Sequence, residues 1–194
     1  MLVSMKQSPA QRPIAWKSLG KVAIFIDAAN VIYSLRDLGW RIDYKRLQSF
    51  FDKKTTLGAI YFYSAYFDDD EGRKNLLDML SRKGFIIRSK VVKKIRTKDG
   101  KILHKANCDV ELTMDAMTVH HSFDTIILMS GDSDFVPVLN YLKSQQKQTV
   151  VISTRGHVAR ELIEAADTFL HFDSFRAVWQ MALPSKNPAK RGSR

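Results

Sequence analysis

The sequence of 194 residues has little that could cross-link it or anchor it in a membrane. Its one cysteine, Cys108, excludes an intramolecular disulfide and a cysteine-based zinc finger, and it suits a reducing compartment. No run of about 18 apolar residues occurs that could span a membrane, and residues 1–20 lack the apolar stretch of a secretion signal. We therefore expect a cytoplasmic protein with no membrane partner.

The sequence also lacks the arrangements on which nucleophilic and zinc catalysis depend. It contains no G-x-S-x-G motif, which disfavours a Ser-His-Asp hydrolase. His120 and His121 close a predicted helix, where they are expected to complement the helix dipole rather than bind a metal. Cys108 is expected to be a small buried residue and not a nucleophile.

Positive charge is what the sequence has in excess. Lys and Arg number 31 against 20 Asp and Glu, for a net charge of +11. A polyanion such as RNA is the partner that this charge favours, with an anionic lipid surface as the alternative. Ten basic residues and one acid lie between Arg82 and Lys105, so this segment carries +9. Residues 1–20 add +3 and residues 184–194 add +4, which leaves the rest of the chain slightly acidic.

Short apolar runs alternate with segments of helical spacing through most of the chain. The first run, KVAIFID at Lys21–Asp27, is typical of a parallel strand buried on both faces. The alternation predicts an α/β fold, a three-layer α/β/α sandwich with a mostly parallel central sheet. The predicted strands are 21–27, 59–65, 85–92, 125–130, 149–153 and 168–172, and the predicted helices are 30–38, 43–53, 71–83, 107–120, 134–144 and 158–166.

One segment interrupts this alternation. Between Lys90 and Lys105, two extended runs flank Lys98-Asp99-Gly100, and Asp-Gly between extended runs is a strong hairpin signal. The sequence therefore predicts a protruding basic β-hairpin.

The ends of the chain differ in composition from the middle. Residues 1–20 mix Gln, Ser, Pro and basic residues and are expected to form a flexible basic tail, followed by one domain over residues 21–173. Residues 174–194 are expected to hold a docked C-terminal helix, over residues 174–183, and then a second basic tail, over residues 184–194. Phe175, Val178 and Trp179 would share the buried side of that helix.

Acidic residues follow two of the predicted central strands. Asp27 ends the first strand, with Asn30 three residues later, and the fourth strand leads into Ser130-Gly-Asp-Ser-Asp134. Asp109 lies near the start of the helix after the hairpin. Ligand sites in such folds lie at the carboxyl ends of the strands, so we expect Asp27, Asp109, Asp132 and Asp134 to converge there.

Each of these acids also has an ordinary structural explanation. Asp27, Asn30 or Asp132 could cap a helix, and Asp109 and Asp134 would gain from a helix dipole. Together, however, carboxylates about 4 Å apart repel by roughly 4 kcal/mol per pair at an effective dielectric constant near 20. A cation removes that repulsion, and an all-oxygen ligand set favours Mg²⁺ or Mn²⁺ over Zn²⁺. Such a site can activate water and neutralise charge on a phosphodiester.

Further residues are candidates for contacts with a substrate. Lys105 lies one helical turn before Asp109 and could hold a phosphate, although a solvated surface lysine is the alternative. Ser130 could bind substrate or bond to a metal ligand, with a purely structural role in its loop as the alternative. Thr154 and Arg155 lie where the next helix could bind an anion. The hairpin residues Lys93, Lys94 and Arg96 are expected to follow the phosphate backbone, and one or two of Tyr61, Tyr63, Tyr66 and Phe67 could stack bases.

These motifs, in this order, resemble the NYN domain of the LabA-like group, within the PIN-like nuclease superfamily. They are Asp27-x-x-Asn30, Lys105-x-x-x-Asp109, Ser130-Gly-Asp-Ser-Asp-Phe-x-Pro137, and Arg160-x-Leu162 with Ala166-Asp167-x-Phe169. The resemblance covers about residues 21–173 and implies a PIN-like, Rossmannoid sandwich. It also implies that Asp27, Asp109, Asp132 and Asp134 bind Mg²⁺ for RNA cleavage, and that Asn30 orients water or substrate.

The sequence thus predicts a metal-dependent endoribonuclease, with Asp27, Asn30, Asp109, Asp132 and Asp134 as catalytic residues. The alternative is an RNA-binding regulatory module that keeps the metal pocket but has little or no catalytic activity. A phosphatase of the haloacid-dehalogenase type is disfavoured, because its chemistry needs Asp-x-Asp after the first strand and this chain has Asp27-Ala-Ala-Asn30. A homo-oligomer is compatible with the sequence but is not specified by it.

Overall fold

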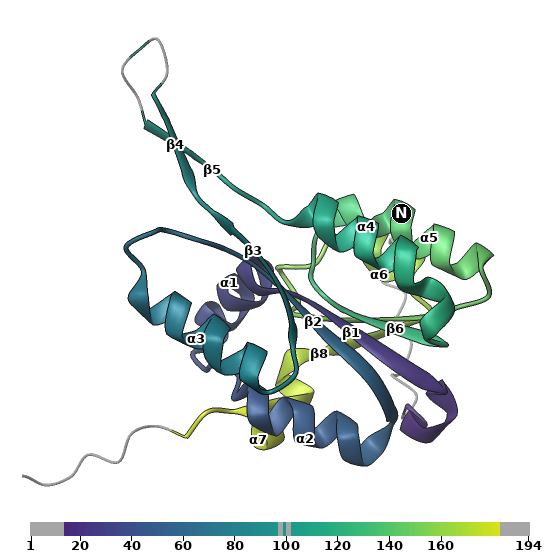
Figure 1. Cartoon of the computed structure of the whole chain (residues 1–194). Helices are drawn as coiled ribbons and strands as arrows, with labels where there is room; N and C mark the ends of the chain where they lie inside the picture. The colour runs from purple at the N-terminus through teal and green to yellow at the C-terminus, as the bar shows by residue number, and fades with distance from the viewer. Residues whose placement is uncertain (1–13, 97–98, 100–101, 183–194) are drawn as a thin grey trace, which may run out of the picture.

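Six parallel strands form one central sheet, with helices on both faces (Figure 1). The computed structural model describes residues 14–96, 99 and 102–182, with side chains for all of these except 94–96 and 102–105. The predicted three-layer α/β sandwich is confirmed, and the sheet is parallel throughout, in the order β3-β2-β1-β6-β7-β8. The strands are β1 (Lys21–Asp27), β2 (Thr56–Tyr66), β3 (Ile86–Val91), β6 (Thr125–Met129), β7 (Gln148–Ser153) and β8 (Thr168–His171).

Side chains along each strand point alternately to the two faces of the sheet, and a different set of helices packs on each face. Ile24 and Ile26 of β1 point to one face and Phe25, between them, points to the other. The first face is covered by α1 (Ala28–Leu38), α2 (Tyr44–Lys54), α3 (Glu71–Arg82) and α7 (Arg176–Trp179), and the second by α4 (Asp109–Val119), α5 (Val136–Ser144) and α6 (Arg160–Ala165). Short 3₁₀ helices are η1 (Trp16–Leu19), η2 (His120–Ser122), η3 (Ser133–Phe135) and η4 (Phe172–Phe175).

Aspartate caps set the starts of several helices. Asp43, the first residue of the predicted helix 43–53, accepts hydrogen bonds from the backbone N–H groups of Lys45 and Arg46 at the start of α2. Asp27, the last residue of β1, caps α1 in the same way. Helix α1 therefore begins at Ala28, two residues before the predicted start.

The prediction of a flexible tail over residues 1–20 is wrong for Trp16–Leu19, which form η1. Trp16, in η1, packs edge-on against Phe50 and Phe51, with ring centroids 5.3 and 5.6 Å apart, and Leu19 is buried. The apolar side chains of η1 thus extend the core on the α2 side of the sheet. Residues 1–13 lie outside the described part of the chain.

The predicted C-terminal helix is shorter than expected. Helix α7 ends at Trp179 because Gln180 leaves the helix to form an isolated antiparallel bridge with Ile42. Phe175 and Trp179 stack with ring centroids 4.0 Å apart. Val178, however, is 45% exposed, so its prediction as a buried residue is wrong.

A two-stranded antiparallel sheet projects from the body between β3 and α4 (Figure 1). It consists of β4 (Lys93–Arg96) and β5 (Ile102–Lys105), with Lys93 opposite Lys105. The turn residues Lys98 and Gly100 lie outside the described residues, as do the side chains of Lys94, Arg96 and Lys105.

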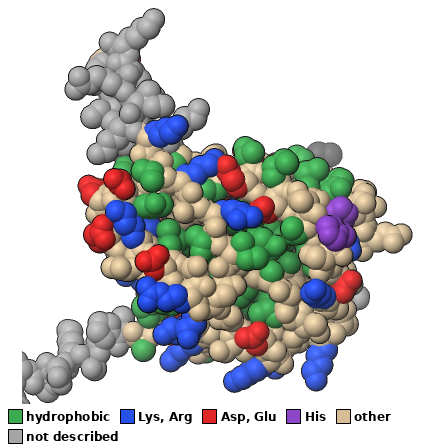
Figure 2. Space-filling view, viewed as in Figure 1, with side chains coloured by type: hydrophobic (Ala, Val, Ile, Leu, Met, Phe, Trp, Pro, Cys, Tyr) green, Lys and Arg blue, Asp and Glu red, His purple; other side chains and the backbone are tan. Residues whose placement is uncertain are grey.

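Helix α4 carries apolar side chains on two sides. Leu112 and Ala116 are buried against the sheet, whereas Val110, Met114 and Met117 are exposed at a spacing of i, i+4 and i+7. Figure 2 shows hydrophobic side chains over this helix. In the part of the chain that the structure describes, no helix has the length and apolar character needed to cross a membrane.

Candidate metal centre

The predicted acids lie where the strand order of the sheet reverses. From β1 the chain continues to β2 and β3 on one side, and later to β6, β7 and β8 on the other. Strands β1 and β6 are hydrogen-bonded neighbours, with Ile26 opposite Met129. Their carboxyl ends therefore lie side by side, at the point of a parallel α/β sheet where ligands usually bind.

Three carboxylates converge at this edge. Asp109, Asp132 and Asp134 each offer a carboxylate oxygen, and these oxygens lie within 4.8 Å of one another. Asp109 comes from the first turn of α4, whereas the other two come from the loop and η3 after β6. The donor set contains oxygen alone, which fits a hard divalent cation such as Mg²⁺ or Mn²⁺.

Asp27 lies beside this cluster, but its oxygens bond within the protein. One oxygen accepts a hydrogen bond from the backbone N–H of Asn30 at 3.2 Å, and the other accepts one from the Ser130 hydroxyl at 2.9 Å. Burial raises the pKa of Asp27 against the opposing effect of these hydrogen bonds, and the nearby charge of Asp132 raises it further. The structure thus brings together three of the four predicted ligands and places the fourth next to them.

The pKa of Asp109 is raised by its burial and by the neighbouring acids. Burial, followed by the charges of Asp27, Asp132, Asp134 and Glu111, raises the pKa of Asp109 to about 6. The Asn107 side-chain amide donates a hydrogen bond to Asp109. Asn107 was not identified from the sequence as a partner of Asp109, although its position two residues before this predicted ligand is a usable signal.

This pKa leads to a prediction for the metal-free chain in EDTA. Between the ordinary pKa of 3.8 and the folded value of about 6, the folded state binds more protons than the unfolded state. The free energy of unfolding therefore loses a contribution from Asp109 as the pH rises through this range, by about 1 kcal/mol for a partly exposed carboxyl group. Asp109→Asn should abolish this loss. Urea unfolding of both proteins at about pH 4 and pH 7 measures it, and a stability difference that does not change with pH would contradict it.

Hydrogen bonds hold the loop that carries Asp132. Asn30 Oδ1 accepts a hydrogen bond from the Gly131 N–H at 2.9 Å, and Asp132 Oδ1 accepts one from the Asp134 N–H at 2.9 Å. Asp27 and Asp132 therefore act as caps as well as members of the acidic edge. The amide oxygen of Asn30 fixes this loop, a role that differs from the water- or substrate-orienting role implied by the resemblance.

Two predicted substrate-binding residues are buried. Ser130 is fully buried and donates to Asp27, which favours a role in positioning that acid over direct contact with substrate. Thr154 is 7% exposed, and its hydroxyl has no hydrogen-bond partner among the described residues. The anion site predicted here is not formed by a helix, because α6 begins at Arg160 and is only six residues long. Arg155 is exposed, and its Nε lies 2.9 Å from His171 Nε2.

Two basic residues of the Arg82–Lys105 segment are neutralised by α4. Arg88 forms an ion pair with Asp115 at 2.9 Å, and Lys90 forms one with Glu111 at 2.6 Å. These pairs connect β3 to α4 and were not predicted, because residues 21 to 27 positions apart give no local signal in the sequence. Lys93 is exposed at the start of β4.

The tyrosines of β2 are mainly core residues, as expected. Tyr61 and Tyr63 stack on Phe25, with ring centroids 4.6 and 6.1 Å away. The Tyr63 hydroxyl donates a hydrogen bond to Asp115 at 3.0 Å. Neither ring is therefore free to stack a base.

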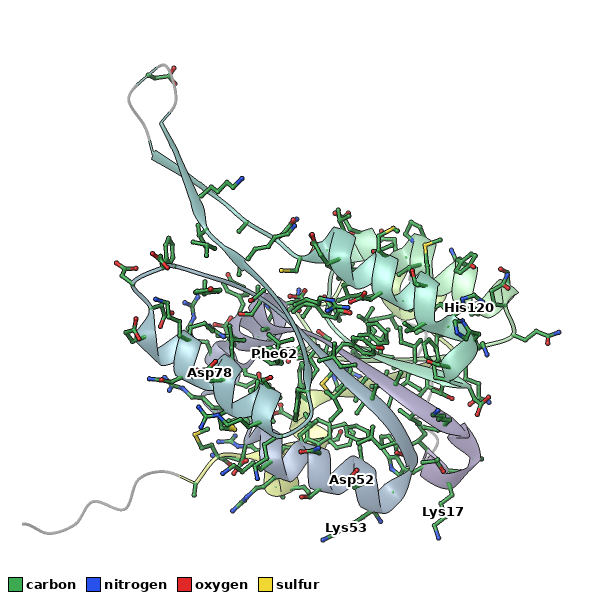
Figure 3. The ribbon with its side chains drawn as sticks, viewed as in Figure 1. Lys17, Asp52, Lys53, Phe62, Asp78 and His120 are labelled. Carbon is green, nitrogen blue, oxygen red and sulfur yellow. The ribbon has the colours of Figure 1, made fainter. Side chains whose placement is uncertain are left out.

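Two residues that the sequence disfavours as catalytic remain disfavoured in the structure. Burial raises the pKa of the Cys108 thiol to about 11, so little reactive thiolate forms at neutral pH. His120 Nδ1 lies 2.7 Å from the Met117 carbonyl oxygen. Figure 3 shows His120 at the end of α4 that is far from the hairpin.

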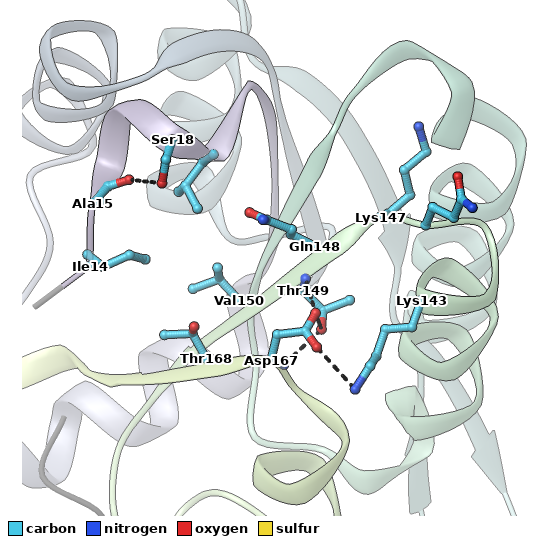
Figure 4. Close-up of a pocket in the computed structure, with 12 residues that line it drawn as sticks. Ile14, Ala15, Ser18, Lys143, Lys147, Gln148, Thr149, Val150, Asp167 and Thr168 are labelled. Atoms are coloured by element: carbon cyan, nitrogen blue, oxygen red, sulfur yellow. Dashed lines mark hydrogen bonds and ion pairs between the residues drawn. The ribbon is translucent and has the colours of Figure 1, made fainter. Parts of the chain in front are cut away.

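A pocket of about 590 Å³ lies at the opposite, amino-terminal edge of the sheet (Figure 4). Its acid, Asp167, accepts hydrogen bonds from the N–H and hydroxyl of Thr149 and pairs with Lys143 at 3.2 Å. Burial raises the pKa of Asp167, but the hydrogen bonds from Thr149 and the ion pair with Lys143 outweigh this effect and lower it. Because its carboxylate is already compensated, this pocket is not the acidic centre.

The fold and the site define an all-parallel α/β sandwich with an acidic centre at the topological switch point. The NYN domain family matches residues 21–173, and the chain belongs to this family. It is 29% identical over 161 residues to "Low amplitude and bright protein LabA" of Synechococcus elongatus, covering 81% of this chain and 86% of that protein. The chain is therefore an NYN domain protein of the LabA-like type.

A solved structure has the same fold. The crystal structure of a protein of unknown function from Vibrio parahaemolyticus superposes with a TM-score of 0.67 at 24% identity, covering 91% of this chain and 100% of that one. Membership of the NYN family, within the PIN-like nucleases, supports a nuclease-like or RNA-related function.

Proposed function

We propose that this chain is a divalent-metal-dependent endoribonuclease that hydrolyses RNA phosphodiesters at the carboxyl edge of β1 and β6. The observation that carries the proposal is the convergence of Asp109, Asp132 and Asp134 from two distant segments. Repulsion between like charges held this close opposes folding unless a cation compensates it. Such arrangements of perturbed acids are typical of functional sites. The NYN family supports the choice of RNA chemistry.

The metal ligands would be Asp109, Asp132 and Asp134, with Asp27 as the next acid. When bound, Mg²⁺ or Mn²⁺ supplies charge neutralisation at the phosphate and an activated water. The chain itself supplies the positioning. Ser130 fixes the Asp27 carboxylate, and Asn30 fixes the loop that carries Asp132.

The proposed substrate is RNA, guided by the basic segment that leads into α4. Lys93 is exposed, and Lys94, Arg96 and Lys105 are the further residues proposed to contact phosphates. Such contacts release counterions, so binding should weaken steeply with salt. We also propose a cytoplasmic location, because a reducing compartment suits the free thiol of Cys108.

The test is cleavage of RNA by the purified chain. A linear RNA and a circular RNA, which has no ends, should both be cut in Mg²⁺ or Mn²⁺ and both remain intact in EDTA. Cutting of the circle distinguishes an endonuclease from an exonuclease. Cleavage that persists in EDTA, or that is absent with both metals, would overturn the proposal.

A second candidate is an RNA-binding regulatory module with little or no catalytic activity. It is favoured by Asp27, whose two oxygens are engaged by Asn30 and Ser130 and which therefore stands apart from the three converging acids. RNA binding in EDTA without metal-dependent cleavage would support this alternative.

A further inference from the structure

An exposed aromatic side chain lies on α1, one helical turn beyond Asn30. Tyr33 is 55% exposed, whereas its neighbours Val31, Ser34 and Leu35 are buried against the sheet. Tyr33 therefore belongs to the solvent-facing side of α1. Unlike the tyrosines of β2, it is not required to fill the core.

Two side chains hold the Tyr33 ring in place. The Arg36 guanidinium lies over the ring, 5.0 Å from its centroid, and His157 approaches edge-on, with centroids 5.1 Å apart and planes at 83°. His157 is held in turn by Asp37, with Nε2 2.8 Å from Oδ2. No carboxylate pairs with Arg36 within the part of the chain that is described, so its charge remains available to a ligand.

This aromatic cluster is directly connected to the acidic edge. The His157 carbonyl lies against Gly131, so closely that a Cβ at that position would overlap it, and the Ala159 N–H donates to the Gly131 carbonyl at 2.8 Å. Gly131 also bonds to Asn30, on the helix that carries Tyr33. The same backbone segment thus joins the Tyr33 cluster to Asp132.

We propose that Tyr33, Arg36 and His157 form a nucleotide-binding subsite for single-stranded RNA beside the acidic centre. Tyr33 stacks on one base, Arg36 binds a neighbouring phosphate, and His157 fixes the tyrosine ring. An unpaired strand is required because the bases of a duplex are not free to stack on a side chain. The inference rests on the proposed function, because it takes RNA as the ligand.

The test compares two short oligomers of equal charge, a single-stranded RNA and a ribose-phosphate chain that lacks bases. Their dissociation constants are measured by fluorescence anisotropy with the full chain in EDTA. The wild-type chain should prefer the RNA, and Tyr33→Leu should reduce this preference about fivefold or more, the effect of losing one stacked base. Tyr33→Phe keeps the ring and should retain the preference.

Arg36→Gln tests the phosphate contact separately. It should weaken the binding of both oligomers and reduce the slope of log affinity against log salt by about 0.7, the value for one contact with a single strand. Val178→Ala removes an exposed apolar side chain from α7 and is the control, with no change expected. Thermal unfolding of each variant shows whether it remains folded.

Three outcomes separate this inference from the proposed function. If Tyr33→Leu prefers RNA as strongly as the wild type does, or if Tyr33→Phe loses as much as Tyr33→Leu, the subsite is overturned while metal-dependent cleavage still stands. If the wild-type chain binds neither oligomer, the subsite and the RNA substrate fall together. If Tyr33→Leu loses the preference but the wild type does not cleave RNA, the subsite stands and the catalytic proposal fails.

Discussion

Asp132→Asn is expected to lower metal-dependent RNA cleavage by about 10³-fold, the range for removing one group that stabilises charge at a reacting centre. Asparagine has the same shape as aspartate, and its side-chain oxygen can still accept the Asp134 N–H that Asp132 accepts at 2.9 Å. The loop should therefore keep its conformation. What the variant loses is one of the three converging charges.

The same substitution should stabilise the metal-free protein. Asp132 raises the pKa values of Asp27 and Asp109, so its charge repels both groups. Removing this repulsion should raise the free energy of unfolding in EDTA by about 1 kcal/mol, or the melting temperature by about 2–4 °C. Mn²⁺ should stabilise the wild type strongly and the variant little, because a ligand stabilises only the state that binds it.

The control for this variant is Asp78→Asn. Asp78 lies on α3, where Figure 3 labels it, whereas the converging acids come from α4 and from the loop and η3 after β6. It should leave cleavage, stability in EDTA and the response to Mn²⁺ unchanged. Full cleavage by folded Asp132→Asn would contradict the assignment of the site, and a loss of stability in EDTA would contradict the account of its electrostatics.

Gly131→Ala should have the largest effect on folding. A Cβ at this position would overlap the His157 carbonyl oxygen and lie 2.9 Å from Val158 Cα. Both are backbone atoms, so relief requires the 154–159 segment to move and the 2.8 Å hydrogen bond from Ala159 to Gly131 to break. We expect a loss of about 3 kcal/mol and a melting temperature lower by about 6–12 °C.

Gly72→Ala is the matched control. Gly72 lies in the first turn of α3, and a Cβ there would meet only Asp70 Oδ1 at an ordinary 3.4 Å. Alanine at an unstrained helical position should leave stability unchanged or raise it by about 0.5 kcal/mol. If Gly131→Ala were as stable as the wild type in thermal unfolding, the close approach of the two loops would be wrong.

The class of fold could be predicted because local sequence patterns indicate most of the strands and helices. The apolar run from Lys21 to Asp27 and the cap at Asp43 both need only a few neighbouring residues to be recognised, and both are confirmed. The errors arose where a distant partner decides the outcome. Trp16 is ordered by Phe50 and Phe51, and α7 stops where Gln180 pairs with Ile42.

The acidic site was predicted in part for the same reason. The carboxyl ends of parallel strands must share an edge, so a sequence that reveals the strands also reveals which acids lie there. Which of these acids bond within the protein was not predictable. Asp27 is engaged by Ser130, 103 residues away, and Asn30 holds Gly131, 101 residues away.

The sequence by itself determined the alternation of strands and helices, the concentration of basic residues in one segment, and the acids Asp27, Asp132 and Asp134 that follow β1 and β6. Those features depend on periodicity, charge and chain direction, which are local. Only the tertiary structure decided that three acids converge while Asp27 is held by Ser130, and that Arg88 and Lys90 pair with α4. It alone placed Tyr33 against His157 beside Gly131. Such contacts join residues far apart in the chain, and their geometry is set by how the layers pack.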